Sequence, residues 1–204
     1  MPRYSQTVCG VDEAGRGPWA GPVVVAAVIL PRDRRIDGIA DSKVLTAEVR
    51  AELFDYIVRE ATVSTAIVGA SRIDTMNIRA ATLWGMVRAV ETLPDLPTVA
   101  LIDGKDIPPG LTVRGRALIK GDGRSTAIAA ASIVAKVTRD RLMTRLARAF
   151  PGYGFERHKG YGTPEHREAL DALGPCCHHR RSFAPIREAY ERVAPPPLAA
   201  MAGD

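Results

Sequence analysis

The sequence predicts an α/β protein, with a mixed β-sheet flanked by helices and a small helical extension at its C-terminal end. Short apolar runs rich in β-branched residues, such as Val23–Leu30 and Val99–Ile102, are bounded by Gly, Pro or acidic residues, which is typical of buried strands. Longer stretches, such as 125–148, place apolar residues at helical spacing. The resulting order of strand, strand, helix, strand, helix, strand, strand, helix predicts a mixed sheet with helices on its faces.

The first 30 residues predict two strands joined by an acidic, glycine-rich turn. Val8–Val11 forms the first strand and Val23–Leu30 the second, while Asp12 and Glu13 stand where the first strand ends. The Gly-Arg-Gly-Pro segment at 15–18 follows, and glycine allows another molecule to approach the backbone closely. Two fixed carboxylates beside an exposed backbone suit a metal-dependent site for phosphoryl transfer.

The remaining elements are predicted from apolar periodicity and from turn residues. In chain order we expect a helix capped by Thr46 and running to about Glu60, a strand at Val63–Gly69, one long helix at Ile73–Leu93, a strand at Val99–Ile102, a short strand at Ala117–Lys120, a helix from Ser125 to about Arg148, and short helices at Pro164–Leu173 and Pro185–Val193. The apolar face expected on the helix before Glu60 consists of Val49, Leu53, Phe54 and Ile57. The proline-rich stretch 195–204 is expected to be a disordered tail, which leaves residues 1–194 as one domain.

The composition favours a basic protein that binds a polyanion. The 204 residues carry a formal net charge of +5, and nucleic acid is the first candidate partner, although an ordinary basic protein has the same balance. No apolar run reaches the roughly 18–20 residues of a membrane span, and no signal-peptide pattern opens the chain. We therefore expect a cytoplasmic protein with no membrane partner. Nothing indicates an oligomer, so a monomer is the default expectation.

The three cysteines are odd in number and unevenly placed, which argues against a disulfide framework. Cys9 lies in the first predicted strand and is expected to be a small core residue. The run from Cys176 to His179 contains four metal-ligating residue types, but consecutive residues do not readily wrap one tetrahedral zinc ion. We expect this run to be a polar loop.

Four carboxylates follow three separate predicted strands: Asp12 with Glu13, then Asp103, then Asp122. Asp-Gly is also a common turn pair, so each of the two later aspartates has an ordinary explanation. If the strand ends converge, however, the clustered carboxylates repel one another, and hard divalent cations with oxygen ligands relieve that repulsion. The set therefore indicates Mg²⁺ or Mn²⁺. Two such ions about 4 Å apart are suited to phosphodiester cleavage.

An ordered set of motifs resembles bacterial type 2 ribonuclease H, the ribonuclease HII family. The matching segments are Asp12–Pro18, Asp41-Ser42-Lys43, Leu101–Gly104, Lys120–Asp122, Ala130–Asp140, His158–Thr163 and His179–Phe183. They run from about residue 7 to residue 190 in the order of the family. One such motif is weak evidence, whereas this ordered set is highly specific. Cys176-Cys177-His178 and the proline-rich tail depart from the family pattern.

The resemblance implies a ribonuclease H-like fold and an endonuclease that hydrolyses the RNA strand of RNA–DNA hybrids. It also implies incision on the 5′ side of a single ribonucleotide embedded in duplex DNA, by two metal ions, leaving 3′-hydroxyl and 5′-phosphate ends. The family's metal-binding carboxylates map onto Asp12, Glu13, Asp103 and Asp122. Its substrate-sensing loop and tyrosine map onto Gly15, Arg16, Gly17 and Tyr161.

Basic residues outside these motifs are candidates for contacts with phosphates of the nucleic-acid backbone, with a solvated surface role as the alternative for each. They are Lys43, Lys120, Arg124, Lys136, Lys159, Arg180 and Arg181. Ser132 and Thr138 are expected to serve helix packing. Two other functions stay open on the sequence: a related metal-dependent DNA nuclease, such as a resolvase or exonuclease, and a non-catalytic module that binds nucleic acid.

Overall fold

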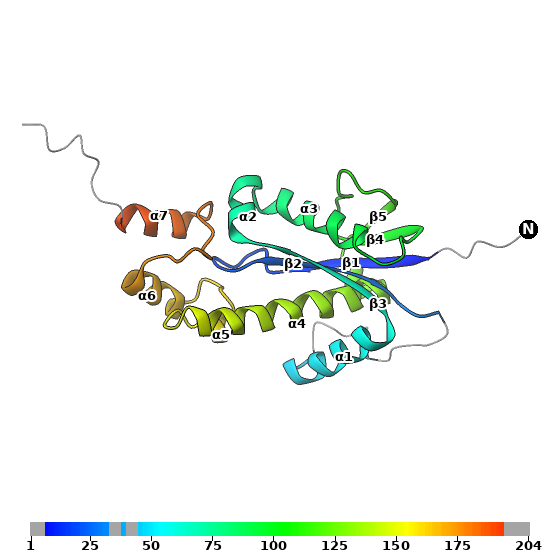
Figure 1. Cartoon of the computed structure of the whole chain (residues 1–204), viewed down its shortest axis with the longest axis horizontal. Helices are drawn as coiled ribbons and strands as arrows, with labels where there is room; N and C mark the ends of the chain where they lie inside the picture. Colours follow the sequence, from blue (N-terminus) through cyan, green and yellow to red (C-terminus); the bar gives the residue numbers. More distant parts are fainter. Residues whose placement is uncertain (1–6, 33–37, 40–44, 194–204) are drawn as a thin grey trace, which may run out of the picture.

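The computed structural model describes residues 7–32, 38–39 and 45–193, and it confirms the mixed sheet (Figure 1). The strands are β1 (Val8–Ala14), β2 (Val23–Ile29), β3 (Thr62–Val68), β4 (Val99–Asp103) and β5 (Arg114–Leu118). They lie in the order β3-β2-β1-β4-β5. β1 and β2 are antiparallel, as are β2 and β3, whereas β4 is parallel to both β1 and β5.

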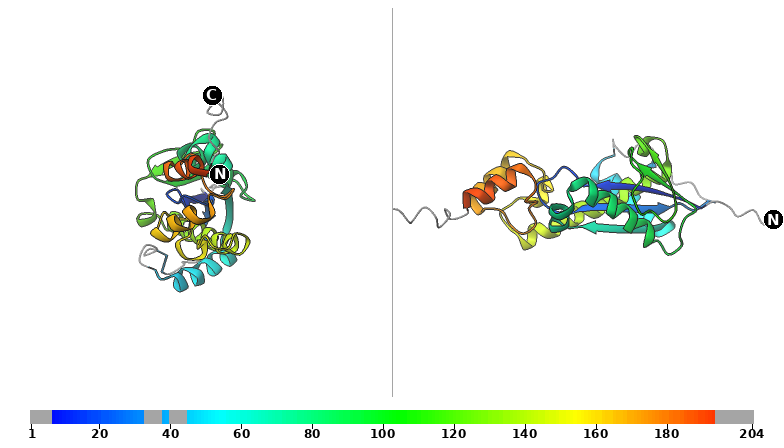
Figure 2. Two further views of the ribbon diagram at one scale, coloured as in Figure 1. Left: turned by 90° about the vertical axis from the view of Figure 1, so that its left-hand side faces the viewer. Right: turned by 90° about the horizontal axis from the view of Figure 1, so that it is seen from above.

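Helices cover both faces of the sheet and extend beyond one of its ends. The helices are α1 (Ala47–Glu60), α2 (Ala70–Met76), α3 (Ile78–Glu91), α4 (Thr126–Ala149), α5 (Phe155–His158), α6 (Pro164–Leu173) and α7 (Ala184–Val193), with a 3₁₀ turn, η2 (Gly121–Gly123), before α4. In Figure 1, α2 and α3 lie on one face, while α4 and α1 lie on the other. Figure 2 shows α6 and α7 at one end of the molecule, which confirms the expected C-terminal helical extension.

Two apolar clusters, one on each face, hold the helices to the sheet. Cys9, Val11, Ala100 and Ile102 belong to the cluster under α3, so the intervening residues of β1 and β4 face α4. Within β2, Val23–Val28 is buried on both faces because the strand lies inside the sheet and carries helices on each side. The prediction that Cys9 is a core residue is confirmed.

The close approach of α4 to β1 depends on Gly10. A Cβ atom at Gly10 would overlap the backbone of Ala127 and Ile128, in the first turn of α4. The missing side chain thus lets the helix backbone rest directly on the strand two residues before Asp12. Ser125 accepts a hydrogen bond from the Ile128 N–H at 3.5 Å and caps this end of α4.

Three details of the predicted elements are wrong. The single helix expected at Ile73–Leu93 is broken at Asn77, whose φ of 67° ends α2 and whose side chain accepts a hydrogen bond from Ala80 N–H to cap α3. The strand expected at Ala117–Lys120 begins earlier, at Arg114, and ends at Leu118 because Lys120 has a left-handed backbone. Val49, expected on the inner face of α1, is 41% exposed. Thr46 does cap α1, as expected.

The C-terminal helices have their own small core, formed by Leu170, Ile186 and Ala189 with Trp19 against it. Trp19 belongs to the loop after β1, so this core joins the extension to the turn that follows the acidic residues. None of the helices in the described parts of the chain is both long enough and apolar enough to span a membrane. The expected tail, 195–204, and the Asp41-Ser42-Lys43 motif fall outside the described residues.

Gly10→Ala is expected to lower the free energy of unfolding by about 1–3 kcal/mol, because the added methyl group forces α4 away from β1. Urea denaturation followed by circular dichroism measures the change. Gly123→Ala is the matched control, since a Cβ atom at Gly123 meets nothing within 4 Å. Equal stability of the two variants would contradict this account of how α4 is seated.

Candidate active site

β1 directs its two adjacent carboxylates to opposite faces of the sheet. Side chains alternate along a strand, so Asp12 shares the α4 face with Gly10, and Glu13 shares the α3 face with Val11. Asp12 is 6% exposed, and its Oδ1 accepts a hydrogen bond from the Glu13 N–H at 2.7 Å. One Oε atom of Glu13 lies 3.3 Å from an Nη atom of Arg16.

Asp103 and Asp122 join this region from the next strand and from the turn before α4. Asp103 ends β4, directly after the residue that pairs with Val11, so it stands beside Asp12. Its Oδ1 accepts a hydrogen bond from the Gly121 N–H at 2.7 Å, which ties β4 to the 3₁₀ turn η2. Asp122 is buried in that turn and does not end a strand, so the prediction of a third strand end is wrong, although the residue reaches the same region.

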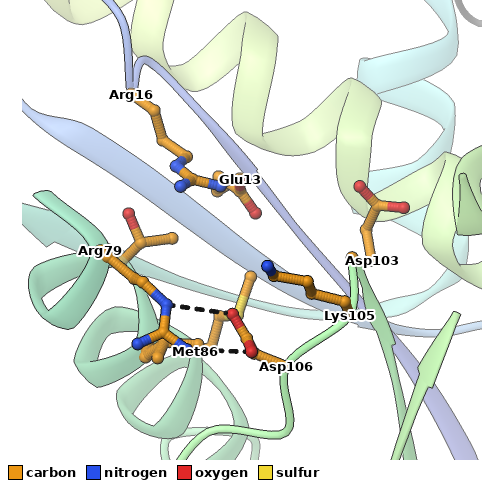
Figure 3. A pocket seen from close by; sticks show the side chains of 10 residues that line it. Glu13, Arg16, Arg79, Met86, Asp103, Lys105 and Asp106 are labelled. Atoms are coloured by element: carbon orange, nitrogen blue, oxygen red, sulfur yellow. Dashed lines mark hydrogen bonds and ion pairs between the residues drawn. The ribbon is translucent and has the colours of Figure 1, made fainter. Parts of the chain in front are cut away.

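Two hollows meet at Glu13. The first, of about 290 Å³, is lined by Glu13, Arg16, Asp103 and Lys105 together with residues of α3. Figure 3 shows Glu13, Asp103 and the extended Lys105 side chain around it, with Arg79 bound to Asp106 at one side.

The second hollow, of about 260 Å³, gathers most of the remaining predicted site residues. It is lined by Glu13, Gly15, Asp122, Ser132 and Tyr161, among others. Asp12 lies within electrostatic range of Glu13 and Asp103. Six of the eight predicted site residues thus line the two hollows, while Asp12 directly precedes Glu13 and Gly17 lies beside Tyr161.

The electrostatics of the carboxylates show the strain of their clustering. Burial raises the pKa of Asp12 well above its usual value, and the neighbouring Glu13 and Asp103 carboxylates raise it further. The Glu13 N–H and the Ser132 hydroxyl oppose this shift by favouring the charged form. Burial also raises the pKa of Glu13, against the lowering effect of the Arg16 guanidinium. The charged forms of Asp12 and Glu13 are thus disfavoured chiefly by burial and further by neighbouring carboxylates.

A divalent cation fits this set of donors. The second carboxylate oxygen of Glu13 is buried and has no hydrogen-bond partner among the described residues, which leaves an oxygen to be satisfied. All four side chains supply hard oxygen ligands, the type that Mg²⁺ and Mn²⁺ prefer. As they stand, no three His, Cys, Asp or Glu side chains in the described ranges are already grouped to hold an ion.

The glycine-containing loop after β1 is held from below by the buried guanidinium of Arg180. Its Nη2 donates to the Gly15 carbonyl at 2.6 Å, its Nη1 to Arg16 at 2.8 Å, and its Nε to Gly21 at 3.0 Å. Burial, together with the nearby Arg139 guanidinium, lowers the pKa of Arg180 to about 9. The side chain therefore remains charged at neutral pH, although it forms no ion pair with a carboxylate in the parts of the chain that the structure describes.

Arg139 of α4 forms the second support. It is 1% exposed and donates to the carbonyls of Pro22 at 3.0 Å and Lys159 at 2.9 Å, so it joins the loop to the segment that carries Tyr161. A Cβ atom at Gly15 would overlap the Arg139 side chain, and φ of Gly15 is +95°, so this position requires glycine. The nearest atom to a Cβ at Gly17 would be a ring carbon of Tyr161, at 3.8 Å.

The basic residues predicted to contact phosphates separate into several groups. Arg180 is fully buried against backbone carbonyls, so its predicted contact with the nucleic-acid backbone is wrong. Lys159 is tied to Thr144 at 3.0 Å and to the Glu156 carbonyl at 2.6 Å. Lys136 lines the second hollow and pairs with Asp140. Lys120, Arg124 and Arg181 are at the surface, and Lys43 lies outside the described residues.

Sequence reasoning missed three residues of the site. Arg139 stands in the sequence only as a member of the Ala130–Asp140 motif, because its burial depends on the approach of two distant loops. Ser132 was expected to serve packing, but its hydroxyl lowers the pKa of Asp12 and it lines the second hollow. Lys105 directly follows Asp103-Gly104, and its position beside a carboxylate strand end is the signal that could have identified it.

The run from Cys176 to His179 forms part of a buried histidine network. Nε2 of His179 lies 3.0 Å from Nε2 of His166, and its Nδ1 accepts the Cys176 N–H at 2.9 Å. Nδ1 of His166 lies 2.9 Å from the Tyr161 carbonyl oxygen. Burial lowers the pKa of His166 to about 4, so the network is neutral at pH 7 and supports the backbone of Tyr161.

Comparison with solved structures identifies the fold. The ribonuclease H2 from Pyrococcus horikoshii superimposes with a TM-score of 0.79 at 29% identity, over 91% of this chain and 98% of that one. The ribonuclease HII of Archaeoglobus fulgidus, solved in a complex with PCNA, gives a TM-score of 0.75 at 28% identity, over 87% of this chain and 95% of that one. A ribonuclease HIII solved in complex with Mn²⁺ shares the fold, with a TM-score of 0.68 at 22% identity, over 92% of this chain and 70% of that one. The molecule is thus a nuclease of the ribonuclease H fold.

Sequence comparison then identifies the family within this class. The family model for ribonuclease HII matches residues 9–186. The ribonuclease HII of Azorhizobium caulinodans is 60% identical over 180 residues, which cover 88% of this chain and 69% of the relative. That of Sinorhizobium fredii is 55% identical over 196 residues, covering 96% and 83%. The chain belongs to the ribonuclease HII family, whose members are metal-dependent endoribonucleases acting on RNA–DNA hybrids.

Asp12→Asn is expected to stabilise the protein by about 1–2 kcal/mol at pH 7 in the presence of a chelator, because it removes a buried, repelled charge. The folded-state pKa of Asp12 lies above the unfolded value of 3.8, so the folded wild type binds more protons and loses stability as the pH rises through this range. The advantage of the variant should therefore grow from pH 4 towards pH 7 in urea denaturation. If Asp12→Asn were less stable than the wild type at pH 7, the charged Asp12 carboxylate would not destabilise the folded protein as we infer.

Arg180→Lys is expected to lower the free energy of unfolding by about 2–4 kcal/mol, because a lysine cannot reach the three carbonyls that the guanidinium bonds. Thermal and urea denaturation measure the loss. The matched control is Arg181→Lys, since the neighbouring Arg181 side chain is exposed over the ring of Tyr190. Comparable losses in both variants would argue against the proposed support of the loop.

Proposed function

We propose that the protein nicks duplex DNA on the 5′ side of a single embedded ribonucleotide and hydrolyses the RNA strand of RNA–DNA hybrids. Asp12, Glu13, Asp103 and Asp122 would hold two divalent ions, Mn²⁺ or Mg²⁺, and cleavage would leave 3′-hydroxyl and 5′-phosphate ends. In this proposal it works as a monomeric cytoplasmic enzyme whose single domain spans residues 1–194.

The observation that carries the proposal is the convergence of the four carboxylates with the glycine loop and Tyr161. Glu13 lines both hollows, so the acidic residues and the predicted substrate-sensing residues border one continuous region. Burial and the neighbouring Glu13 and Asp103 carboxylates raise the pKa of Asp12, and bound cations would favour its charged form. The Mn²⁺ complex of the ribonuclease HIII of the same fold is consistent with a divalent ion.

The chemistry divides between the ions and the chain. When bound, the cations would activate water for attack on phosphorus and stabilise the leaving 3′ oxygen. The carboxylates of β1, β4 and η2 would fix the position of the phosphate relative to the attacking water, because each stands at the end of a rigid element. Lys105 and Arg16, which line the first hollow, would offset the charge of the scissile phosphate.

Recognition of the ribonucleotide would come from the loop and the tyrosine. The 2′-hydroxyl is the feature that separates RNA from DNA at a given site. The backbone of Gly15–Gly17 can approach it closely because no side chain intervenes, and Tyr161, 46% exposed, presents its ring beside Gly17. Arg139 and Arg180 keep these two segments in register.

A labelled DNA duplex with one ribonucleotide, compared with an all-DNA duplex, tests the proposal. With Mn²⁺ or Mg²⁺, we expect a single nick on the 5′ side of the ribonucleotide, no cleavage of all-DNA and no activity with a chelator. Cleavage of the all-DNA duplex would favour the alternative of a related DNA nuclease.

Asp12→Asn should reduce this cleavage at least about 10³-fold, because it removes a proposed ligand of the ions while preserving the shape of the side chain. Asp106→Asn is the matched control, since Asp106 borders the same hollow but is bound by Arg79. We expect the control to retain activity within about tenfold. Similar rates for Asp12→Asn and the wild type would overturn the proposed site.

A further inference from the structure

A third hollow, of about 400 Å³, lies between the N-terminal part of α1 and the C-terminal half of α4. These two helices lie side by side on the same face of the sheet (Figure 1). Cationic side chains dominate the lining: Arg50, Arg141, Arg145, Arg148 and Lys159. We call these five residues the basic groove. Among the described residues, Asp140 is the one carboxylate that lines it, and it pairs with Lys136 at 2.9 Å.

The basic groove continues from the catalytic region. Arg50 lines both this groove and the second hollow, which Asp122 and Tyr161 also border. Along α4, Lys136 lines the catalytic hollow and the arginines follow towards the end of the helix. At 1.5 Å per residue, the stretch from Lys136 to Arg148 is about 18 Å long. Because duplex DNA rises about 3.4 Å per base pair along its axis, this length corresponds to about five base pairs of duplex.

Two cations of the groove are available to an anion. Arg145 and Arg148 are exposed and have no hydrogen bond or ion pair within the described parts of the chain. Arg141 is held over the ring of Phe54 at 4.4 Å and pairs with Asp55 at 3.3 Å, so its position is fixed in advance. Arg141, Arg145 and Arg148 follow an i, i+4, i+7 spacing, where like charges repel and weaken a helix. The helix dipole favours a cation in the last turn, at Arg148, but does not account for Arg141.

We infer that the basic groove binds the phosphodiester backbone of the duplex flanking the cut. This inference rests on the proposed function, since it places the flanking duplex relative to the carboxylates. The groove contributes affinity through phosphate charge and reads no sequence, because cationic side chains dominate its lining and contacts to phosphates carry no sequence information. The reacting phosphate stays with the carboxylates, so the groove acts on substrate binding and leaves the cleavage step unchanged.

The test compares the wild type with a double variant that carries both Arg145→Gln and Arg148→Gln. The probe is a fluorescent DNA duplex with one ribonucleotide, and anisotropy without divalent cation gives Kd over a range of salt concentrations. We expect Kd to rise about tenfold at low salt and the slope of log affinity against log salt to fall by about 2. The cleavage rate at saturating protein should be unchanged. The control is a second double variant, which carries both Arg59→Gln and Arg88→Gln. It removes the same amount of positive charge, but from arginines that form exposed ion pairs and line none of the three hollows.

Shortening the duplex on each side of the ribonucleotide in turn locates the effect. The difference between the double variant and the wild type should vanish when one flank is too short to reach the groove, and persist when the other is shortened. An unchanged Kd and salt slope, or an equal effect on the shortest duplexes, would overturn the inference while wild-type cleavage still supports the proposed function. Absence of wild-type cleavage on any ribonucleotide substrate would instead overturn the proposed function.

Discussion

The site depends on two buried guanidinium groups, Arg139 and Arg180, which form no ion pair with a carboxylate among the described residues. Arg139 and Arg180 bind the backbone carbonyls of the loop after β1 and of the segment before Tyr161, and so join three stretches far apart in the sequence. A loop rich in glycine and proline has little structure of its own, and charged donors to buried carbonyls stabilise it more than neutral ones. Because the two cations also repel each other, the arrangement persists only through the full set of hydrogen bonds that each makes.

The carboxylates, in contrast to these buried cations, are anions that lie close together. Asp12, Glu13 and Asp103 are placed together by strand register and by the close seating of α4 on Gly10, and the charges raise one another's energy. The clustering of these carboxylates thus lowers the stability of the folded protein, and bound divalent cations would offset this loss. The buried guanidinium groups beneath the loop and the clustered carboxylates beside it belong to the same region, which suits a phosphate-containing substrate that binds together with metal ions.

Much of this site could be predicted from the sequence, because motif order and the ends of apolar runs are local signals. The four carboxylates, the Gly15–Gly17 loop and Tyr161 were predicted, and the structure brings them together. The burial of Arg139 and Arg180 could not be predicted, since their partners are carbonyls up to 165 residues away, and a carbonyl has no sequence signature. The break at Asn77 was missed for another reason: a single side-chain cap outweighed a helical pattern that continued on both sides.

The central claim is that the four carboxylates act as one cation-binding unit. Isothermal titration of Mn²⁺ tests it most directly, with the wild type compared with the single variants Asp12→Asn, Glu13→Gln, Asp103→Asn and Asp122→Asn. The account predicts that each variant weakens binding, by tenfold or more for Asp12, on which the Glu13 and Asp103 carboxylates both act electrostatically. Wild-type affinity in all four variants would contradict it.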